Sequence, residues 1–183
     1  MASQSQPDIY LASQSPRRRE LLAQMGLPYV PLDVAVDETR HEDESPEVFV
    51  IRLALEKARA GWSQVAETRP LPVLGADTAV VLDGDVLGKP ADRADALRML
   101  GRLSGQQHQV LTGVAMVDDR EVTRLNVNRV RFRELGQVEL ERYWASGEPV
   151  GKAGAYAIQG YGGVFAEHLE GSYSGVMGLP LFE

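Results

Sequence analysis

Apolar residues along the chain fall into short runs typical of strands and into stripes at helical spacing, with turn residues between them. Two helix starts are marked by Ser15-Pro16 and Ser45-Pro46, where a capping residue precedes a proline suited to the first helical position. The expected helices span residues 16–25, 45–62, 92–103 and 138–146, and the expected strands span 8–12, 29–36, 73–82, 86–87, 109–117 and 121–132. This order predicts a mixed α/β sheet rather than a regular parallel one.

Turn residues predict two hairpins, at Asp83-Gly84-Asp85 and at Asp118-Asp119. In the strand after the second turn, the apolar phase changes between residues 125–127 and 130–132, which predicts a bulge near Asn128. The last 33 residues contain 8 of the 18 glycines, set between aromatic and β-branched residues. We expect tight hairpins with two strands there rather than a disordered tail.

The composition is that of a soluble globular protein and predicts a single domain over residues 1–183, with residues 1–7 disordered. Hydrophobic residues make up 44% of the chain and charged residues 25%. No apolar run reaches the roughly 20 residues that a membrane span needs, and the polar start does not resemble a signal peptide. We therefore expect a cytoplasmic protein with no membrane partner.

The net charge of the chain is −7, from 26 acidic and 19 basic residues. A nucleic-acid polymer is not an expected partner, because proteins that bind one need a basic field to displace counterions. A small anionic ligand is still compatible with this charge, since a local cluster of bases can dominate one site.

The chain has no cysteine, which excludes disulfides, thiolate zinc sites and cysteine nucleophiles. The three histidines, His41, His108 and His168, are scattered without the spacing of metal ligands. Taken alone, His108 is more typical of a hydrogen-bonded structural histidine than of a catalyst. Any metal is therefore expected to be a hard cation held by carboxylates, such as magnesium.

Three arginines, residues 17–19, occupy the first turn of a helix, where the macrodipole penalises positive charge. An anion on this turn would explain them, because backbone N–H groups, guanidinium groups and the hydroxyls of Ser13 and Ser15 could all bind it. The alternative is a solvated arginine run on an exposed helix face. The preceding strand, the two serines and the helix start together favour the anion site.

Lys57 and Asp77 each interrupt an apolar pattern. Lys57 falls opposite the polar stripe of Arg52, Glu56 and Arg59 on its helix, so its ammonium group either snorkels to solvent or points toward a functional site. Asp77 lies inside an apolar strand and needs a cation, a metal or hydrogen bonds if it is buried, although it could also cap a neighbouring loop. A buried carboxylate of this kind is a candidate for binding a metal or activating water.

Seven short motifs are distributed along nearly the whole chain. They are LASQSPRR (11–18), EKA (56–58), GADT (75–78), KP (89–90), SGxxHxVxTG (104–113), GKAGAYAIQG (151–160) and GSYSGVMGLP (171–180). In this order they resemble the Maf family of nucleoside triphosphate pyrophosphatases. The resemblance implies a Maf/ITPase-like α/β fold, with an elongated mixed sheet flanked by helices and two lobes around a central cleft. It also implies hydrolysis of a nucleoside triphosphate to the monophosphate and pyrophosphate, with Mg²⁺ or Mn²⁺ as the metal.

The same resemblance implies roles for individual residues. Asp77 matches the family's proposed proton acceptor, and Glu38 and Asp77 are candidate magnesium ligands. Arg17, Thr78 and Gln159 match the specificity positions of the branch that acts on dTTP and UTP, where Gln159 can pair with a pyrimidine edge. The implied phosphate-binding residues are Ser13, Ser15, Arg18, Lys57, Lys89 and Lys152. A housecleaning role and a homodimer are implied as well.

Two features depart from the family pattern. Gln14 stands where glycine is common, and the chain ends at Glu183, where relatives usually continue into a final helix. Two other functions remain open: a pyrophosphatase for modified purines such as 7-methyl-GTP, and a non-catalytic nucleotide sensor that regulates cell division and septum formation. Thr78 and Gln159 argue against the first, and the retained Asp77 and lysines argue against the second.

Overall fold

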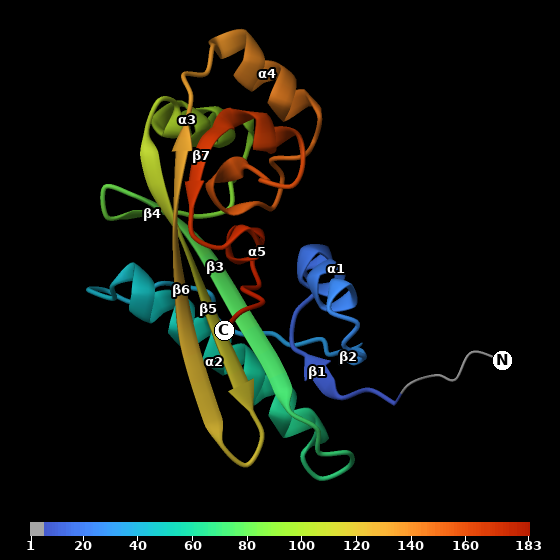
Figure 1. Ribbon diagram of the computed structural model, residues 1–183. Coiled ribbons are helices and arrows are strands. Elements are labelled where there is room, and N and C mark those ends of the chain that lie inside the picture. Colours follow the sequence, from blue (N-terminus) through green and yellow to red (C-terminus); the bar gives the residue numbers. More distant parts are fainter. Residues whose placement is uncertain (1–5) are drawn as a thin grey trace, which may run out of the picture. The chain divides into compact units, whose positions relative to one another are not determined.

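The computed structural model describes residues 6–183, which form seven strands and five α-helices (Figure 1). In chain order they are β1 (Ile9–Leu11), α1 (Pro16–Gln24), β2 (Tyr29–Pro31), α2 (Pro46–Val65), β3 (Val73–Leu82), β4 (Asp85–Leu87), α3 (Arg93–Leu103), β5 (Gln107–Val117), β6 (Glu121–Phe132), α4 (Gln137–Ala145), β7 (Ala166–Glu170) and α5 (Tyr173–Met177). Two short 3-10 helices, η1 (Ala153–Ala155) and η2 (Tyr161–Phe165), precede β7. Of the expected disordered segment, positions 1–5 lie outside the described residues.

The strands form one mixed sheet, which confirms the predicted fold class. Along the sheet the order is β2-β1-β3-β5-β6-β7, and β4 pairs with β3. β1 runs parallel to β2 and β3, whereas the β3–β4 and β6–β7 pairs are antiparallel. Within residues 6–183, no helix is both long and apolar enough to cross a bilayer.

The chain divides into two compact units, as the implied two lobes require. The first unit contains residues up to Asp77 together with 112–125 and 178–183, and the second contains 78–111 and 126–177. The long strands β3, β5 and β6 contribute residues to both.

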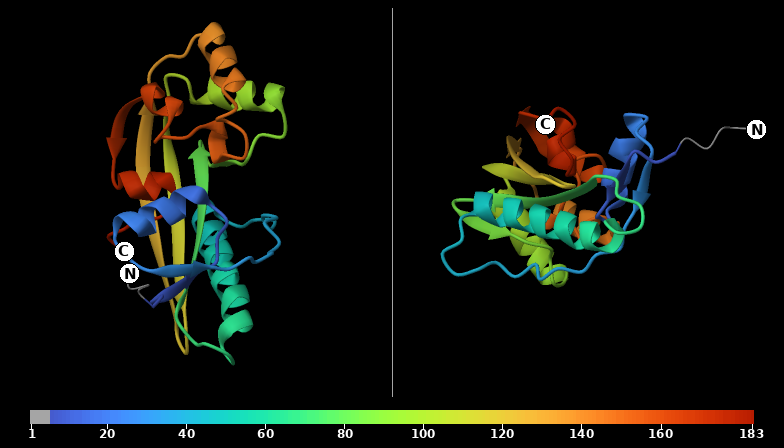
Figure 2. Two further views of the ribbon diagram at one scale, coloured as in Figure 1. Left: turned by 90° about the vertical axis from the view of Figure 1, so that its right-hand side faces the viewer. Right: turned by 90° about the horizontal axis from the view of Figure 1, so that it is seen from below.

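In the first unit, α2 covers one face of the strands (Figure 2). Its backbone lies directly against two glycines of these strands. A Cβ atom on Gly75 of β3 would lie 2.2 Å from the carbonyl oxygen of Ala54 and 2.8 Å from the amide nitrogen of Ala58, both on α2. Gly113 of β5 meets α2 in the same way, since its Cβ would lie 2.4 Å from the carbonyl oxygen of Val50. Glycine is needed at these two positions because the helix backbone itself contacts the strands. The predicted start of α2 is confirmed, with the Ser45 hydroxyl accepting a hydrogen bond from the Val48 amide.

The second unit has an aromatic core. The rings of His108, Phe132, Tyr156, Phe165 and Tyr143 pack edge to face, with neighbouring centroids 4.8–5.8 Å apart. Such arrangements pair the positive ring edge with the negative ring face. The predicted hairpin between β3 and β4 is confirmed as a two-residue turn, in which Asp83 (φ 52°) and Gly84 (φ 83°) are both left-handed. This is the turn type that Asp-Gly favours between antiparallel strands.

Two sequence predictions were wrong in detail. The strand expected over 29–36 ends at Pro31, because its partner β1 is itself only three residues long and the chain then turns into α1. The glycine-rich end does not form hairpins. It contains η1, η2, the single strand β7 and the short helix α5.

The bulge expected near Asn128 stays a prediction. The more buried positions of β6 change from Thr123 and Leu125 to Asn126 and Asn128, and from Asn126 onward buried and exposed side chains alternate. The Asn128 amide donates to the Val110 carbonyl and to the Asn126 side chain, and it accepts from the Ser172 amide. The register of β6 with β7 shifts between Arg131 and Phe132.

Replacing Gly75 with alanine tests the close approach of α2 to β3. The added methyl group would collide with the α2 backbone, so we expect Gly75→Ala to lower the free energy of unfolding by roughly 3 kcal/mol in urea titrations. Gly101→Ala is the matched control. Gly101 lies in α3 with no atom within 4 Å of an added Cβ, so this change should be neutral or slightly stabilising. Equal stability of Gly75→Ala and the unmodified protein would contradict the close packing.

Candidate functional site

Lys57 holds two carboxylates together in the first unit. Its ammonium nitrogen donates to Glu38 Oε1 and to Asp77 Oδ1, and both distances are 2.7 Å. The side chains of Lys57 and Asp77 are only 11% and 13% exposed, whereas Glu38 is 45% exposed. Two charges this deeply buried are costly unless each is paired. Lys57 therefore does not snorkel, and it is the cation that the buried Asp77 was expected to require.

Local geometry explains why these residues meet. Gly75 and Asp77 are two positions apart on β3, so they point to the same face of the strand. That face receives α2, where Ala54 and Ala58 touch Gly75 and Lys57 reaches Asp77. The buried positions of α2 include Lys57 among apolar residues, as the sequence predicted. On its polar stripe, Arg52 pairs with Glu56 at 3.2 Å.

The first turn of α1 is fixed by Arg18, which is buried. Its Nε donates to the Gly178 carbonyl at 2.7 Å and its Nη1 donates to the Ser13 hydroxyl at 3.1 Å. Burial lowers the pKa of the Arg18 guanidinium, while the charges of Asp77 and Glu38 act in the opposite direction. Arg18 is thus within electrostatic range of both carboxylates that Lys57 holds.

Ser15, Arg17 and Gln14 lie on or next to the same turn of α1. Ser15 is the N-cap of α1 by its backbone angles, but its side chain makes no capping hydrogen bond; its amide donates to the Ser13 hydroxyl instead. Arg17 is half-buried. Burial lowers the pKa of its guanidinium group, and the negative charge of Glu20 has a smaller effect in the opposite direction. Gln14, the residue that departs from the family pattern, accepts a hydrogen bond from Arg19 at 2.8 Å.

Glu38 belongs to an irregular loop that is tied down by an ion pair not predicted from the sequence. Arg52 on α2 donates to both carboxylate oxygens of Glu44, at 2.7 and 2.9 Å. It also donates to the carbonyl of Thr39, the residue next to Glu38, at 3.0 Å. The hydrogen bonds from Arg52 lower the pKa of the buried Glu44 to about 2, so the pair stays charged at neutral pH. In the sequence, Glu44 is one of several acids in a polar stretch, and nothing distinguishes it.

The remaining predicted site residues lie in the second unit. Thr78 is half-buried on β3, and Lys89 is exposed between β4 and α3. Lys152 precedes η1 and donates to the Val150 carbonyl at 3.3 Å, and Gln159 is exposed just before η2. Their roles stay predictions.

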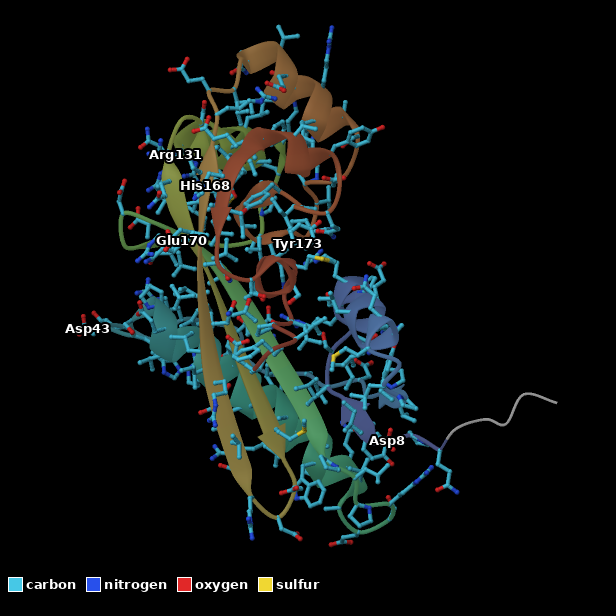
Figure 3. All side chains as sticks on the ribbon, viewed as in Figure 1. Asp8, Asp43, Arg131, His168, Glu170 and Tyr173 are labelled. Carbon is cyan, nitrogen blue, oxygen red and sulfur yellow. The ribbon has the colours of Figure 1, made fainter. Side chains whose placement is uncertain are left out.

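The two histidines of the second unit, His108 and His168, lie on different strands, β5 and β7. His108 is buried and shares a hydrogen bond with the Tyr156 hydroxyl at 2.9 Å, and burial lowers its pKa to about 4. The imidazole is therefore neutral at pH 7, which confirms the structural role expected for it. His168 lies exposed on β7 opposite Arg131 (Figure 3).

The candidate metal ligands in the first unit are two carboxylates, those of Glu38 and Asp77. Among the described residues, no group of three or more histidine, cysteine, aspartate or glutamate side chains is placed to hold one. Magnesium commonly takes only one or two carboxylates and completes its shell with water and substrate phosphates. Glu38 and Asp77, whose oxygens converge on one cationic group, fit that kind of site.

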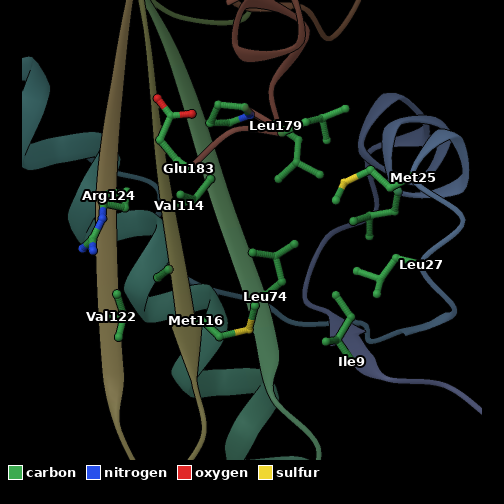
Figure 4. A pocket seen from close by; sticks show the side chains of 14 residues that line it. Ile9, Met25, Leu27, Leu74, Val114, Met116, Val122, Arg124, Leu179 and Glu183 are labelled. Carbon is green, nitrogen blue, oxygen red and sulfur yellow. The ribbon is translucent and has the colours of Figure 1, made fainter.

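A separate cavity of about 200 Å³ lies in the first unit, lined mostly by apolar side chains (Figure 4). Its walls include Leu22 from α1, Met25 just after that helix, Leu74 from β3 and Val114 from β5. Arg124 and Glu183 are its charged lining residues. The predicted catalytic and phosphate-binding residues do not line this cavity, so it is distinct from the candidate site.

The sequence is similar to a family model and to named proteins over nearly its whole length. The chain matches the family model described as Maf-like protein over residues 8–183. It is 64% identical to the dTTP/UTP pyrophosphatase of Alkalilimnicola ehrlichii, over 100% of this chain and 92% of that protein. It is 57% identical to the dTTP/UTP pyrophosphatase of Pectobacterium atrosepticum, over 96% and 88% of the two chains. Among solved structures, a nucleoside-triphosphatase/dITP/XTP pyrophosphatase from Mycobacterium abscessus is similar at a TM-score of 0.46 and 21% identity, over 69% of this chain and 74% of that one.

Removing the Lys57 ammonium group tests whether it holds the two carboxylates. Lys57→Met keeps the length of the side chain but leaves Asp77 buried without its cation, so we expect a loss of about 3 kcal/mol in the free energy of unfolding. Arg59→Met on the same helix is the control. It breaks an ion pair with Glu121 in which both partners are exposed, and it should leave stability nearly unchanged. Equal losses in the two variants would show that Lys57 makes no special contribution.

Proposed function

Since the chain belongs to the Maf family, we propose that it hydrolyses nucleoside triphosphates, with dTTP and UTP as substrates, to the monophosphate and pyrophosphate. The observation that carries this function is the pairing of Lys57 with Glu38 and Asp77, close enough to Arg18 for their charges to interact. Cations spread the negative charge of a reacting triphosphate, and a carboxylate can orient and deprotonate water. The names of these two relatives favour dTTP and UTP over modified purines.

In this proposal the triphosphate is bound by cations and hydroxyl groups. The proposed phosphate-binding residues are Ser13, Ser15, Arg18, Lys57, Lys89 and Lys152. The anchoring of Arg18 by the Gly178 carbonyl supports such a role, because it fixes a guanidinium group on the first turn of α1 before any ligand binds. An anion there would also offset the unfavourable placement of three arginines at a helix start.

Asp77 is proposed to assist the attack of water on the α-phosphorus. The water oxygen forms the new bond to phosphorus, its proton passes to the Asp77 carboxylate, and the bond to the pyrophosphate oxygen breaks. Glu38 and Asp77 would hold a divalent cation, Mg²⁺ or Mn²⁺, which when bound neutralises phosphate charge.

Substrate choice is proposed to depend on Arg17, Thr78 and Gln159. The side-chain amide of Gln159 carries both a donor and an acceptor, which suits the edge of a pyrimidine base. The exposure of Gln159 supports contact with a ligand. A housecleaning role, a cytoplasmic location, a homodimer and the absence of a nucleic-acid partner also remain proposals.

Replacing Asp77 with asparagine tests the chemistry. We expect Asp77→Asn to lose at least about 100-fold in turnover of UTP, because the amide cannot accept the proton, while nucleotide binding is retained. Pyrophosphate release with dTTP, UTP, 7-methyl-GTP and ITP in the presence of magnesium gives the rates, and calorimetry gives the affinities.

Asp33→Asn is the matched control, since Asp33 lies exposed in the same unit and Gln64 donates to its backbone carbonyl, which the substitution leaves in place. It should behave like the unmodified protein. Near-normal turnover by Asp77→Asn would overturn the assignment of Asp77. Nucleotide binding without pyrophosphate release by the unmodified protein would instead favour a sensor.

A further inference from the structure

The carboxylate of Glu148 organises the glycine-rich segment that follows it in the second unit. Glu148 Oε2 accepts a hydrogen bond from the Tyr161 amide at 2.9 Å, and Oε1 accepts one from the Gly162 amide, also at 2.9 Å. Oε1 also accepts from the Tyr143 hydroxyl at 2.7 Å. Three donors from two parts of the chain therefore converge on one side chain that is only partly exposed.

Tyr143 extends this contact to the other end of the segment. Its hydroxyl oxygen accepts a hydrogen bond from the Ala157 amide at 3.1 Å, while its proton goes to Glu148. Tyr143 is buried on α4 and its ring packs against Phe165, so its hydroxyl has little freedom to move. Glu148 and Tyr143 together fix the backbone at Ala157 and at Tyr161-Gly162.

The glycines of the segment are required by this arrangement. A Cβ atom on Gly160 would lie 2.1 Å from Glu148 Oε2, and one on Gly162 would lie 2.7 Å from the Tyr143 hydroxyl oxygen. A side chain at either position would displace Glu148 or Tyr143 from this arrangement. This accounts for glycines that the sequence pattern suggested were hairpin turns.

Gln159 lies between the two fixed points, two residues after Ala157 and two before Tyr161. We propose that Glu148 and Tyr143 are positioning residues that set the preference for the nucleotide base through Gln159. This inference rests on the proposed role of Gln159 in choosing the substrate. A side chain that reads a base by hydrogen bonds discriminates well only when its backbone is held in place before the ligand arrives.

The charge of Glu148 matters to this role. A carboxylate only accepts hydrogen bonds, and here all three partners are donors. A glutamine at this position would place its own N–H group against one of them, so at least one hydrogen bond would be lost and the backbone around residue 160 would shift. The volume of the side chain would hardly change, which separates this effect from a packing defect.

Kinetic selectivity between UTP and CTP tests the proposal. On the pairing edge, uracil has an acceptor at O4 and a donor at N3, whereas cytosine has a donor at N4 and an acceptor at N3, so an amide oriented for one base is mismatched to the other. We expect Glu148→Gln to raise KM for UTP about tenfold with kcat changed less than about twofold, and to lower the ratio of kcat/KM for UTP over CTP by about tenfold. Tyr143→Phe should shift the ratio in the same direction and is the second variant if Glu148→Gln folds poorly. Glu141→Gln, on the exposed side of α4 next to Arg93, is the control and should keep the ratio.

A double-mutant cycle with Gln159→Ala shows whether Glu148 acts through Gln159. If it does, Glu148→Gln will change the UTP/CTP ratio little in a protein that already carries Gln159→Ala. Thermal unfolding of every variant identifies those that are only destabilised. An unchanged ratio in both Glu148→Gln and Tyr143→Phe, or full additivity with Gln159→Ala, would overturn the inference. Failure of the unmodified protein to release pyrophosphate from UTP or dTTP would instead overturn the proposed function.

Discussion

The ion pair between Lys57 and Asp77 is the contact on which the candidate site depends. It is possible only because Gly75 lets the backbone of α2 lie directly against β3, which places a lysine and an aspartate from two elements 2.7 Å apart. Burial raises the cost of leaving either charge alone, so each fixes the position of the other. Glu38 then joins the same ammonium group from a loop, and the result is two acidic groups and one basic group in a small volume.

Glu38 reaches Lys57 from a loop and not from a helix or strand. Residues between β2 and α2 form no strand or helix. Their order instead comes from Arg52, which spans Glu44 and the carbonyl of Thr39. In the second unit, Glu148 and Tyr143 hold the segment around Gln159 in a similar way, since these side chains accept hydrogen bonds from backbone amides, whereas Arg52 donates one to a backbone carbonyl. Both arrangements place a predicted ligand-binding residue beside a fixed point of the backbone.

Much of this could be predicted from the sequence because the signals were local. Serine-proline pairs marked the starts of α1 and α2, Asp83-Gly84 marked a turn, and the apolar surroundings of Lys57 and Asp77 showed that both were unusual. What could not be predicted depends on contacts distant in sequence. Gly75 contacts the backbone of α2, and Asn126 and Asn128 form a buried hydrogen-bonded pair, which no local pattern indicates. Glu148 lies five residues from Tyr143 and more than ten from its backbone partners, so no local pattern reveals it.

In the proposed reaction, water attacks the α-phosphorus of a pyrimidine nucleoside triphosphate. Hydrolysis of UTP and dTTP in ¹⁸O-labelled water with magnesium, followed by mass spectrometry of the products, shows which phosphorus is attacked. We expect a nucleoside monophosphate that carries one ¹⁸O atom and unlabelled pyrophosphate. Labelled pyrophosphate, or a nucleoside diphosphate with inorganic phosphate, would contradict it.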